Sequence, residues 1–276
     1  MEIKDFGYFI NREKNKPCLV AGNAPSLKNF PYDKFKGIYF LMNSGPILLK
    51  GRAYPTYWLS ANYKDPVPHL HYKKINLFRK CTYIFSDTAT YCVGNKYNHN
   101  LISNRLRIDW FAFDERHINH KKCDPVLPCC EFVDIYPQRL TIFEYMQKHF
   151  AMSEVCPKPT TAVIYSLMFA IIAGCSPIYL QGIELPVYQK DYLQYKMFHP
   201  ESLRNIKYVL RSYIRGWIHG RPEHSGFYDG YERNFSVFEC LVKLCHEIGI
   251  EIYNLSPTSA LNQIKILPYL DYRKVC

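Results

Sequence analysis

Three asparagines and one glutamate stand where buried strands are expected to end. Asn23, Asn43 and Asn62 each close a short apolar run, and Glu184 follows another. An amide both donates and accepts hydrogen bonds, so it suits sugar hydroxyls and the edge of a pyrimidine base. Asparagine is also common in turns, which is the alternative for each residue taken alone. Three asparagines at equivalent positions favour a binding site for a polar ligand.

The loop from Ala21 to Ser26 follows the first of these strands and precedes a helical segment. Its small residues would let backbone N–H groups approach a ligand, and the start of a helix favours phosphate. The loop matches neither GxGxxG nor a P-loop. It is a candidate for nucleotide binding, with a plain turn at Pro25 and a helix cap at Ser26 as the alternative.

A stretch rich in histidine and tyrosine, residues 188–233, supplies candidates for catalysis. His224 lies in a polar loop of this stretch, and a histidine can take a proton from a hydroxyl near neutral pH. Any of the ten histidines is an alternative from the bare sequence. The candidates to stabilise a leaving phosphate are Tyr188, Tyr192 and Tyr195. We expect 188–233 to form a helical, lid-like excursion, with an ordinary solvated basic helix as the alternative.

The sequence favours a reaction that needs no metal and no cofactor. It contains no DxD motif, no HExxH motif and no paired carboxylates at strand ends. Hydroxyls and a cation, for which Lys158 is a candidate, would then meet the leaving phosphate.

Strands and helices alternate along most of the chain. Short apolar runs bounded by turn residues are typical of central parallel strands. Such runs are found at 16–22, 38–43, 56–62, 82–87, 178–183 and 250–255, with a weaker candidate at 105–113. The alternation predicts one α/β domain over 1–276, with a doubly wound, mostly parallel, Rossmann-like sheet and a helical lid. Ligands of such folds bind beyond the carboxyl ends of the strands, where the asparagines, Glu184 and Ser256 would converge.

Helices are expected between the strands. Capping-box spacing predicts helix starts at Thr141 and Ser236, and Thr160 with Thr161 opens the most apolar helix. The helix from Ser236 is expected to bury Phe238, Leu241, Cys245 and Ile248. Shorter helical segments are expected at 32–35 and 68–79.

Composition limits the cellular context. Lys and Arg number 35 against 24 Asp and Glu, a net charge of +11, which suits anionic partners. The basic residues are scattered and no nucleic-acid motif is present, so we expect no nucleic-acid partner. Eleven cysteines without a CxxC pair indicate free thiols in a reducing compartment. The N-terminus has no apolar signal, and the longest apolar run, 162–175, is too short to span a bilayer, so a cytoplasmic protein is expected.

Four blocks of the chain resemble the bacterial family-42 sialyltransferases. Val20–Leu27 (VAGNAPSL) is similar to that family's AGNGPSL, and Thr160-Thr161 opens the long apolar helix. Ile178–Glu184 (IYLQGIE) is similar to its IYLSGID, and Ile252–Ser259 (IYNLSPTS) to its LYCLCPNS. The blocks occur in the family's order and spread over most of the chain.

The resemblance implies a GT-A-like, modified Rossmann fold with a flexible lid, and inverting, metal-independent transfer from CMP-sialic acid. The donor-binding positions that it implies are Asn23, Ser26, Asn43, Asn62, Lys158, Thr160, Thr161 and Glu184, with the cytosine-side loop at Ser256, Pro257 and Thr258. His224 is the best match for the catalytic base, with His219 as the alternative. Tyr188, with Tyr192 or Tyr195, would hold the leaving phosphate.

Three departures from the family leave the donor sugar open. Lys158 stands where the family has arginine, Pro186 where it has its first lid tyrosine, and Glu184 where it has aspartate. Legionaminic acid, pseudaminic acid and Kdo are also CMP-activated and suit the same chemistry. The acceptor would be a glycan or a lipid-linked oligosaccharide, as in bacterial lipooligosaccharide biosynthesis. The family also implies a homo-oligomer, and the basic lid suggests peripheral association with the inner membrane.

The sequence is also compatible with two other functions. Proteins that share the first block include pterin pyrophosphokinase-like enzymes, which would need ATP and Mg²⁺. The second alternative is a non-catalytic nucleotide-binding relative that kept the fold and lost the catalytic activity. The changes at Lys158 and Pro186 suggest this hypothesis.

Overall fold

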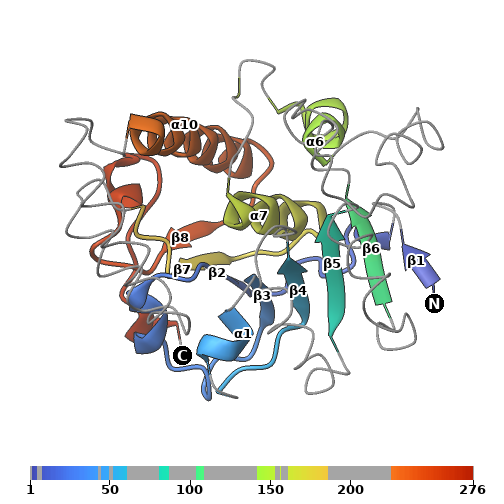
Figure 1. Cartoon of the computed structure of the whole chain (residues 1–276), viewed down its shortest axis with the longest axis horizontal. Helices are drawn as coiled ribbons and strands as arrows, with labels where there is room; N and C mark the ends of the chain where they lie inside the picture. Colours follow the sequence, from blue (N-terminus) through green and yellow to red (C-terminus); the bar gives the residue numbers. More distant parts are fainter. Residues whose placement is uncertain are drawn as a thin grey trace, which may run out of the picture.

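The computed structural model describes residues 2–4, 8–42, 45–49, 52–60, 81–86, 104–108, 142–152, 156, 161–185 and 225–275. Within this part of the chain, eight strands form one sheet in the order β1-β6-β5-β4-β3-β2-β7-β8 (Figure 1). Every neighbouring pair is parallel. The strands are β1 (Glu2–Lys4), β2 (Cys18–Ala21), β3 (Ile38–Met42), β4 (Tyr57–Ser60), β5 (Thr82–Ser86), β6 (Asn104–Ile108), β7 (Ile178–Gln181) and β8 (Ile252–Asn254). The predicted doubly wound α/β fold is confirmed.

The order in which the chain adds strands to the sheet reverses between β2 and β7. From β2 the chain builds β3, β4, β5 and β6 outward on one side, whereas β7 lies on the other side of β2 and leads outward to β8. The connections that leave β2 and β7 therefore diverge. In an open parallel sheet such a switch point leaves a crevice beyond the carboxyl ends of the two strands, and ligands bind there.

Helices cover both faces of the sheet, which parallel strands require. One face carries α6 (Ile142–Phe150), α7 (Ala162–Ile172) and α10 (Ser225–Glu247), and the opposite face carries α1 (Gly45–Leu48) (Figure 1). The 3₁₀ helix η2 (Pro25–Asn29) packs on that second face through Leu27. Of the described helices, none is long and apolar enough to span a membrane.

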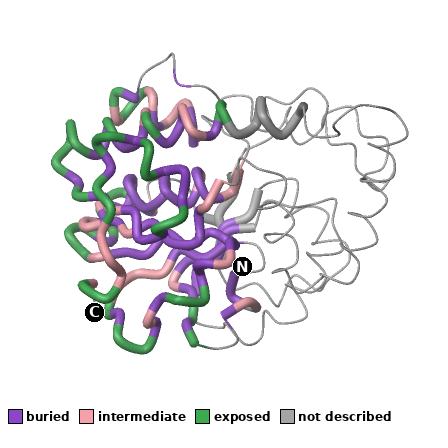
Figure 2. The backbone as a smooth tube through the Cα atoms, turned by 90° about the vertical axis from the view of Figure 1, so that its left-hand side faces the viewer, coloured by how far each residue is buried: buried purple, intermediate pink, exposed green. Residues whose placement is uncertain are grey.

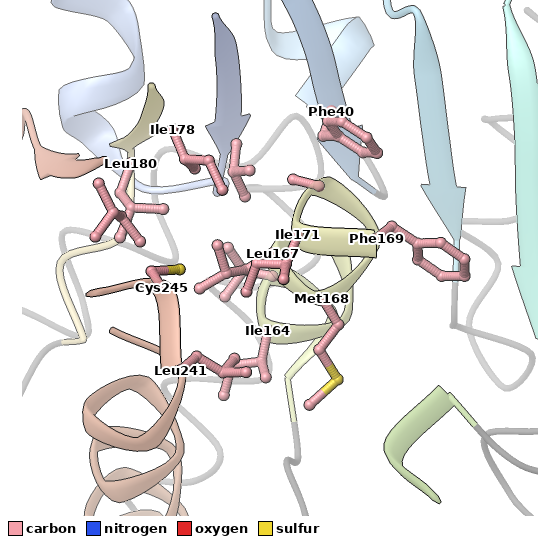
Figure 3. Packing of buried hydrophobic residues seen from close by; sticks show 14 of the residues in the cluster. Phe40, Ile164, Leu167, Met168, Phe169, Ile171, Ile178, Leu180, Leu241 and Cys245 are labelled. Atoms are coloured by element: carbon pink, nitrogen blue, oxygen red, sulfur yellow. The ribbon is translucent and has the colours of Figure 1, made fainter. Parts of the chain in front are cut away.

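The strand residues alternate between two apolar cores. On β2, Cys18 and Val20 face the core under α7, while Leu19 and Ala21 face the core under η2. Nine of the eleven residues of α7 are buried, because this helix lies between the sheet and its neighbouring helices. Figure 3 shows Leu167 of α7 among residues of β7 and α10. Figure 2 shows buried backbone at the centre of the described part of the chain and exposed residues along its outer edge.

The strand predictions are confirmed to within one or two residues at most ends. The weaker candidate at 105–113 is the strand β6, and β1 was not predicted. The helix expected from Thr141 is α6, and the helix that follows Thr160-Thr161 is α7, with Thr161 at its N-cap.

The predicted helix start at Ser236 is wrong. The helix α10 begins eleven residues earlier, at Ser225, so Ser236 lies in its interior. The Ser236 hydroxyl donates to the carbonyl of Glu232 at 3.0 Å, the back-bonding that serine makes inside a helix. Phe238, Leu241 and Cys245 are buried as predicted, but Ile248 follows the end of the helix and is 41% exposed.

The short helical segment predicted at 32–35 is not formed. Residues 32–34 form a turn, and the helical turn of this region is instead η2, which starts at Pro25. The segment 68–79 lies outside the described residues, as does 188–224 of the lid-like stretch. Residues 225–233 of that stretch belong to α10.

Candidate functional site

The loops that follow β2, β7 and β8 meet at the switch point. The Ala24 N–H donates to the Gly182 carbonyl at 3.0 Å, which joins the first two loops. The Ala260 N–H donates to the Glu184 carbonyl at 3.0 Å, which joins the second and third. Segments far apart in the chain thus meet where the sequence predicts the binding site.

Two glycines let the first two loops cross at close range. A Cβ atom on Gly22 would lie 2.1 Å from the Gly182 carbonyl oxygen, far inside van der Waals contact. Gly182 itself has a φ of +69°, a left-handed conformation that favours glycine. Because no side chain fits between them, these positions require glycine, and the two loops meet through their backbones.

Ser26 connects the three loops. Its backbone N–H donates to Glu184 Oε1 at 2.9 Å, and its hydroxyl is 2.9 Å from the Ser256 hydroxyl. The Ser256 hydroxyl also accepts from the Gly182 N–H at 3.1 Å. Ser26 is separated from Glu184 by 158 residues and from Ser256 by 230. The structure therefore brings together three of the residues that the sequence singles out, one from each loop.

Gln181 belongs to the same cluster, although the sequence did not identify it. Its Nε2 donates to the Ser26 carbonyl at 2.6 Å, so Gln181 and Glu184 hold the two backbone groups of Ser26 from the same strand end. Gln181 Oε1 and Glu184 Oε2 are buried and accept no hydrogen bond from the described residues. The only sequence signal is that Gln181 stands where the family motif IYLSGID has serine.

Burial raises the pKa of the Glu184 carboxyl, since a charge loses hydration there. Hydrogen bonds from the hydroxyl and the backbone N–H of Ser26 stabilise the charged form and oppose this shift in pKa. The cluster thus combines a carboxyl group, two hydroxyls and an amide in a largely buried setting, where hydrogen bonds are electrostatically stronger than in water.

The other described candidates lie around this cluster. Asn23 is 7% exposed, and its side-chain oxygen would lie 3.1 Å from a Cβ placed on Gly45, at the start of α1. Ser256 is fully buried, whereas Pro257 and Thr258 are exposed. Thr161 is partly buried before α7 and is not hydrogen-bonded to the described residues of the cluster.

The remaining candidates have no described position. Asn43, Asn62, Lys158, Thr160, Tyr188, Tyr192, Tyr195 and His224 lie outside the described residues, so their roles stay predictions. Within the described part of the chain, no three His, Cys, Asp or Glu side chains are grouped closely enough to hold a metal ion.

Comparison with protein-family models gives no match, and comparison with curated proteins gives none either. Several solved structures do resemble the chain. The α-2,3-sialyltransferase from Campylobacter jejuni in apo form shares 17% identity and a TM-score of 0.46, over 99% of this chain and 85% of that one. The sialyltransferase CstII from Campylobacter jejuni, in complex with cytidine 5′-monophosphate, shares 14% identity and a TM-score of 0.46, over 94% of this chain and 86% of that one.

A Cst-II variant in complex with CMP shares 16% identity and a TM-score of 0.47, over 92% of this chain and 86% of that one. All three solved structures are sialyltransferases, the class that the four sequence blocks resemble. At these identities and TM-scores, neither the role of a residue nor the substrate of this chain follows from the likeness.

The substitution Glu184→Gln tests the electrostatics of the cluster. A raised pKa means that the folded chain keeps the proton at pH values where the unfolded chain, with a pKa near 4.3, has lost it. The contribution of this group to wild-type stability therefore falls as pH rises through the interval between the two pKa values. Glutamine stays neutral and keeps an oxygen for the Ser26 N–H. We expect the Tm of the variant, minus that of the wild type, to increase from pH 4 to pH 7.

The measurement is thermal unfolding across this pH range, with Glu239→Gln on the exposed surface of α10 as the matched control. A difference in Tm that is constant with pH, or that shrinks as pH rises, would contradict the assigned direction of the Glu184 shift.

Proposed function

We propose that this chain is a glycosyltransferase that moves a sialic-acid-like sugar from a CMP-activated donor to a glycan acceptor. One observation carries the proposal. Three of the four sequence blocks that resemble the family-42 sialyltransferases meet at one site, through Ser26, Glu184 and Ser256. Blocks that were independent signals in the sequence are parts of one cluster in the fold.

The site suits a nucleotide on physical grounds. It lies at the switch point of a parallel sheet, where nucleotides bind in related architectures. Gly22 and Gly182 let the backbones of two of its loops pack directly against each other, which brings the polar groups of these loops together. The hydroxyl, amide and carboxyl groups of the cluster match the donors and acceptors of a nucleoside. Pro257 and Thr258 are exposed beside the cluster, as a surface against which the base would lie.

His224 is the proposed general base. It directly precedes α10 in the sequence. It would take the proton of the acceptor hydroxyl while that oxygen bonds to the anomeric carbon of the sugar. The bond from that carbon to the phosphate oxygen breaks, and CMP leaves with the bonding electrons. A single displacement of this kind inverts the anomeric configuration.

The leaving phosphate would be stabilised by hydrogen bonds from Tyr188 with Tyr192 or Tyr195, and by the charge of Lys158. No metal ion and no cofactor are part of this proposal. Positioning of donor and acceptor, together with phosphate stabilisation, would supply most of the rate.

The sugar, acceptor and setting are proposals that rest on the resemblance. The donor would carry sialic acid or a related acid such as legionaminic acid, pseudaminic acid or Kdo. The acceptor would be a glycan or a lipid-linked oligosaccharide, processed in the cytoplasm or at the surface of the inner membrane by a homo-oligomer.

A nucleotide panel tests the donor class. A ligand that binds only the folded chain raises its Tm. We expect CMP and CDP to raise the Tm, with no loss of the effect in EDTA, and UDP, GDP and ATP to leave the Tm unchanged. A rise that is confined to ATP with Mg²⁺ would instead support the pyrophosphokinase-like alternative and would remove the CMP-sugar proposal.

His224→Ala tests the catalytic base. Loss of a general base lowers turnover by roughly 100-fold or more, while CMP affinity should stay within about twofold. The measurement is sugar transfer under donor saturation, together with the Kd for CMP. His149→Ala, at an exposed position near the end of α6, is the control and should transfer at the wild-type rate. Near-normal turnover by the His224 variant would remove this assignment and leave His219 as the candidate.

A further inference from the structure

Two asparagine side-chain amides hydrogen-bond to the turn that follows β8. Asn254, the last residue of β8, is fully buried. Its Nδ2 donates to the Ser256 carbonyl at 3.1 Å and to Asn262 Oδ1 at 2.6 Å, and its Oδ1 accepts from the Ser256 N–H at 3.2 Å. One side-chain amide therefore holds both backbone groups of Ser256, which is the residue whose hydroxyl meets Ser26.

Asn262 holds the same turn from the other side. It lies on the 3₁₀ helix η5 (Ala260–Gln263), and its Nδ2 donates to the carbonyls of Ser256 at 3.2 Å and of Pro257 at 2.9 Å. Because the Asn254 amide occupies Asn262 Oδ1, the orientation of the Asn262 amide is fixed and its donors must point at the turn.

The helix η5 is itself tied to the cluster. The Ala260 N–H donates to the Glu184 carbonyl at 3.0 Å, and the Ser259 hydroxyl donates to the Ile183 carbonyl. A displacement of η5 would therefore move the turn at Ser256 and the loop at Glu184 together.

The hydrogen bonds around this amide pair involve residues that differ between this chain and the family motif. Asn254 and Ser256 stand where the family's LYCLCPNS has cysteine at both positions. Cysteine is a weak donor and acceptor, so it cannot make the hydrogen bonds that Asn254 and Ser256 make here. The polar network is therefore specific to the residues of this chain.

We propose that Asn254 and Asn262 are positioning residues for binding of the donor nucleotide, an inference that rests on the proposed function. They act through the turn Ser256–Thr258 and do not themselves contact the donor. The amide pair holds the exposed Pro257 and Thr258, and the Ser256 hydroxyl, in the arrangement that binds. A turn that is already ordered need not lose conformational freedom when the nucleotide arrives, so affinity is higher.

Asn262→Asp is the sharpest test. Asn262 is exposed, so the variant should fold. Aspartate keeps an oxygen for the Asn254 Nδ2, but it loses both donors and turns a carboxylate oxygen toward the carbonyls of Ser256 and Pro257. We expect the Kd for CMP and the KM for the donor to rise about tenfold, with kcat and the acceptor KM within about twofold of wild type. The Tm without nucleotide should stay within about 2 °C of wild type.

Gln263→Glu is the matched control, because Gln263 is the next residue of η5, is exposed, and undergoes the same amide-to-acid change. It should bind CMP as the wild type does. Wild-type affinity in the Asn262 variant would overturn the inference while leaving the proposed function intact. Equal weakening in both variants would assign the effect to charge near the phosphate and would also overturn it. If the wild type binds no CMP, the proposed function itself fails, and the inference falls with it.

Discussion

The close crossing of Gly22 and Gly182 is the constraint on which the rest of this site depends. Parallel strands β2 and β7 lie side by side at the switch point of the sheet, and their outgoing loops can meet only if no Cβ separates them. Once the backbones touch, Ser26 falls within hydrogen-bond distance of both the β7 loop and the β8 loop. A larger residue at Gly22 would push these loops apart and break the hydrogen bonds of the cluster even in the chain without ligand.

Most polar side chains of the cluster bond to a backbone group of another loop, and the hydroxyls of Ser26 and Ser256 meet each other. Gln181 and Glu184 hold Ser26, Ser256 accepts from Gly182, and Ser259 bonds to Ile183. Burying such groups is costly unless they are hydrogen-bonded. Bonds between loops offset much of this cost, although Gln181 Oε1 and Glu184 Oε2 accept no hydrogen bond from the described residues, and the same bonds fix how the loops lie against one another. Loops held in this way are preorganised, which positioning and electrostatic stabilisation of a bound substrate require.

The sheet could be predicted from sequence because its central strands are short apolar runs, such as Ile38–Met42, that helices bury on both faces. The start of α10 could not, because Gly226 and Gly230 lower helix propensity near its first turns while Ser236 and Glu239 imitate a capping box. Glu184 and Ser256 were identified by their places at strand ends, and Ser26 by the small-residue loop that follows the first predicted strand. Gln181 was missed because its hydrogen-bond partner, the Ser26 carbonyl, is 155 residues away in the sequence and only the fold brings the two together.

We propose that the loops after β2, β7 and β8 bind the donor nucleotide, and a crystal structure of the chain with CMP would decide this. We expect the nucleotide to lie beyond the carboxyl ends of β2 and β7, with its ribose or phosphate within hydrogen-bond distance of the Asn23–Ser26 loop and its base against Pro257 and Thr258. CMP bound elsewhere, without contact to these loops, would show that they are not the donor site.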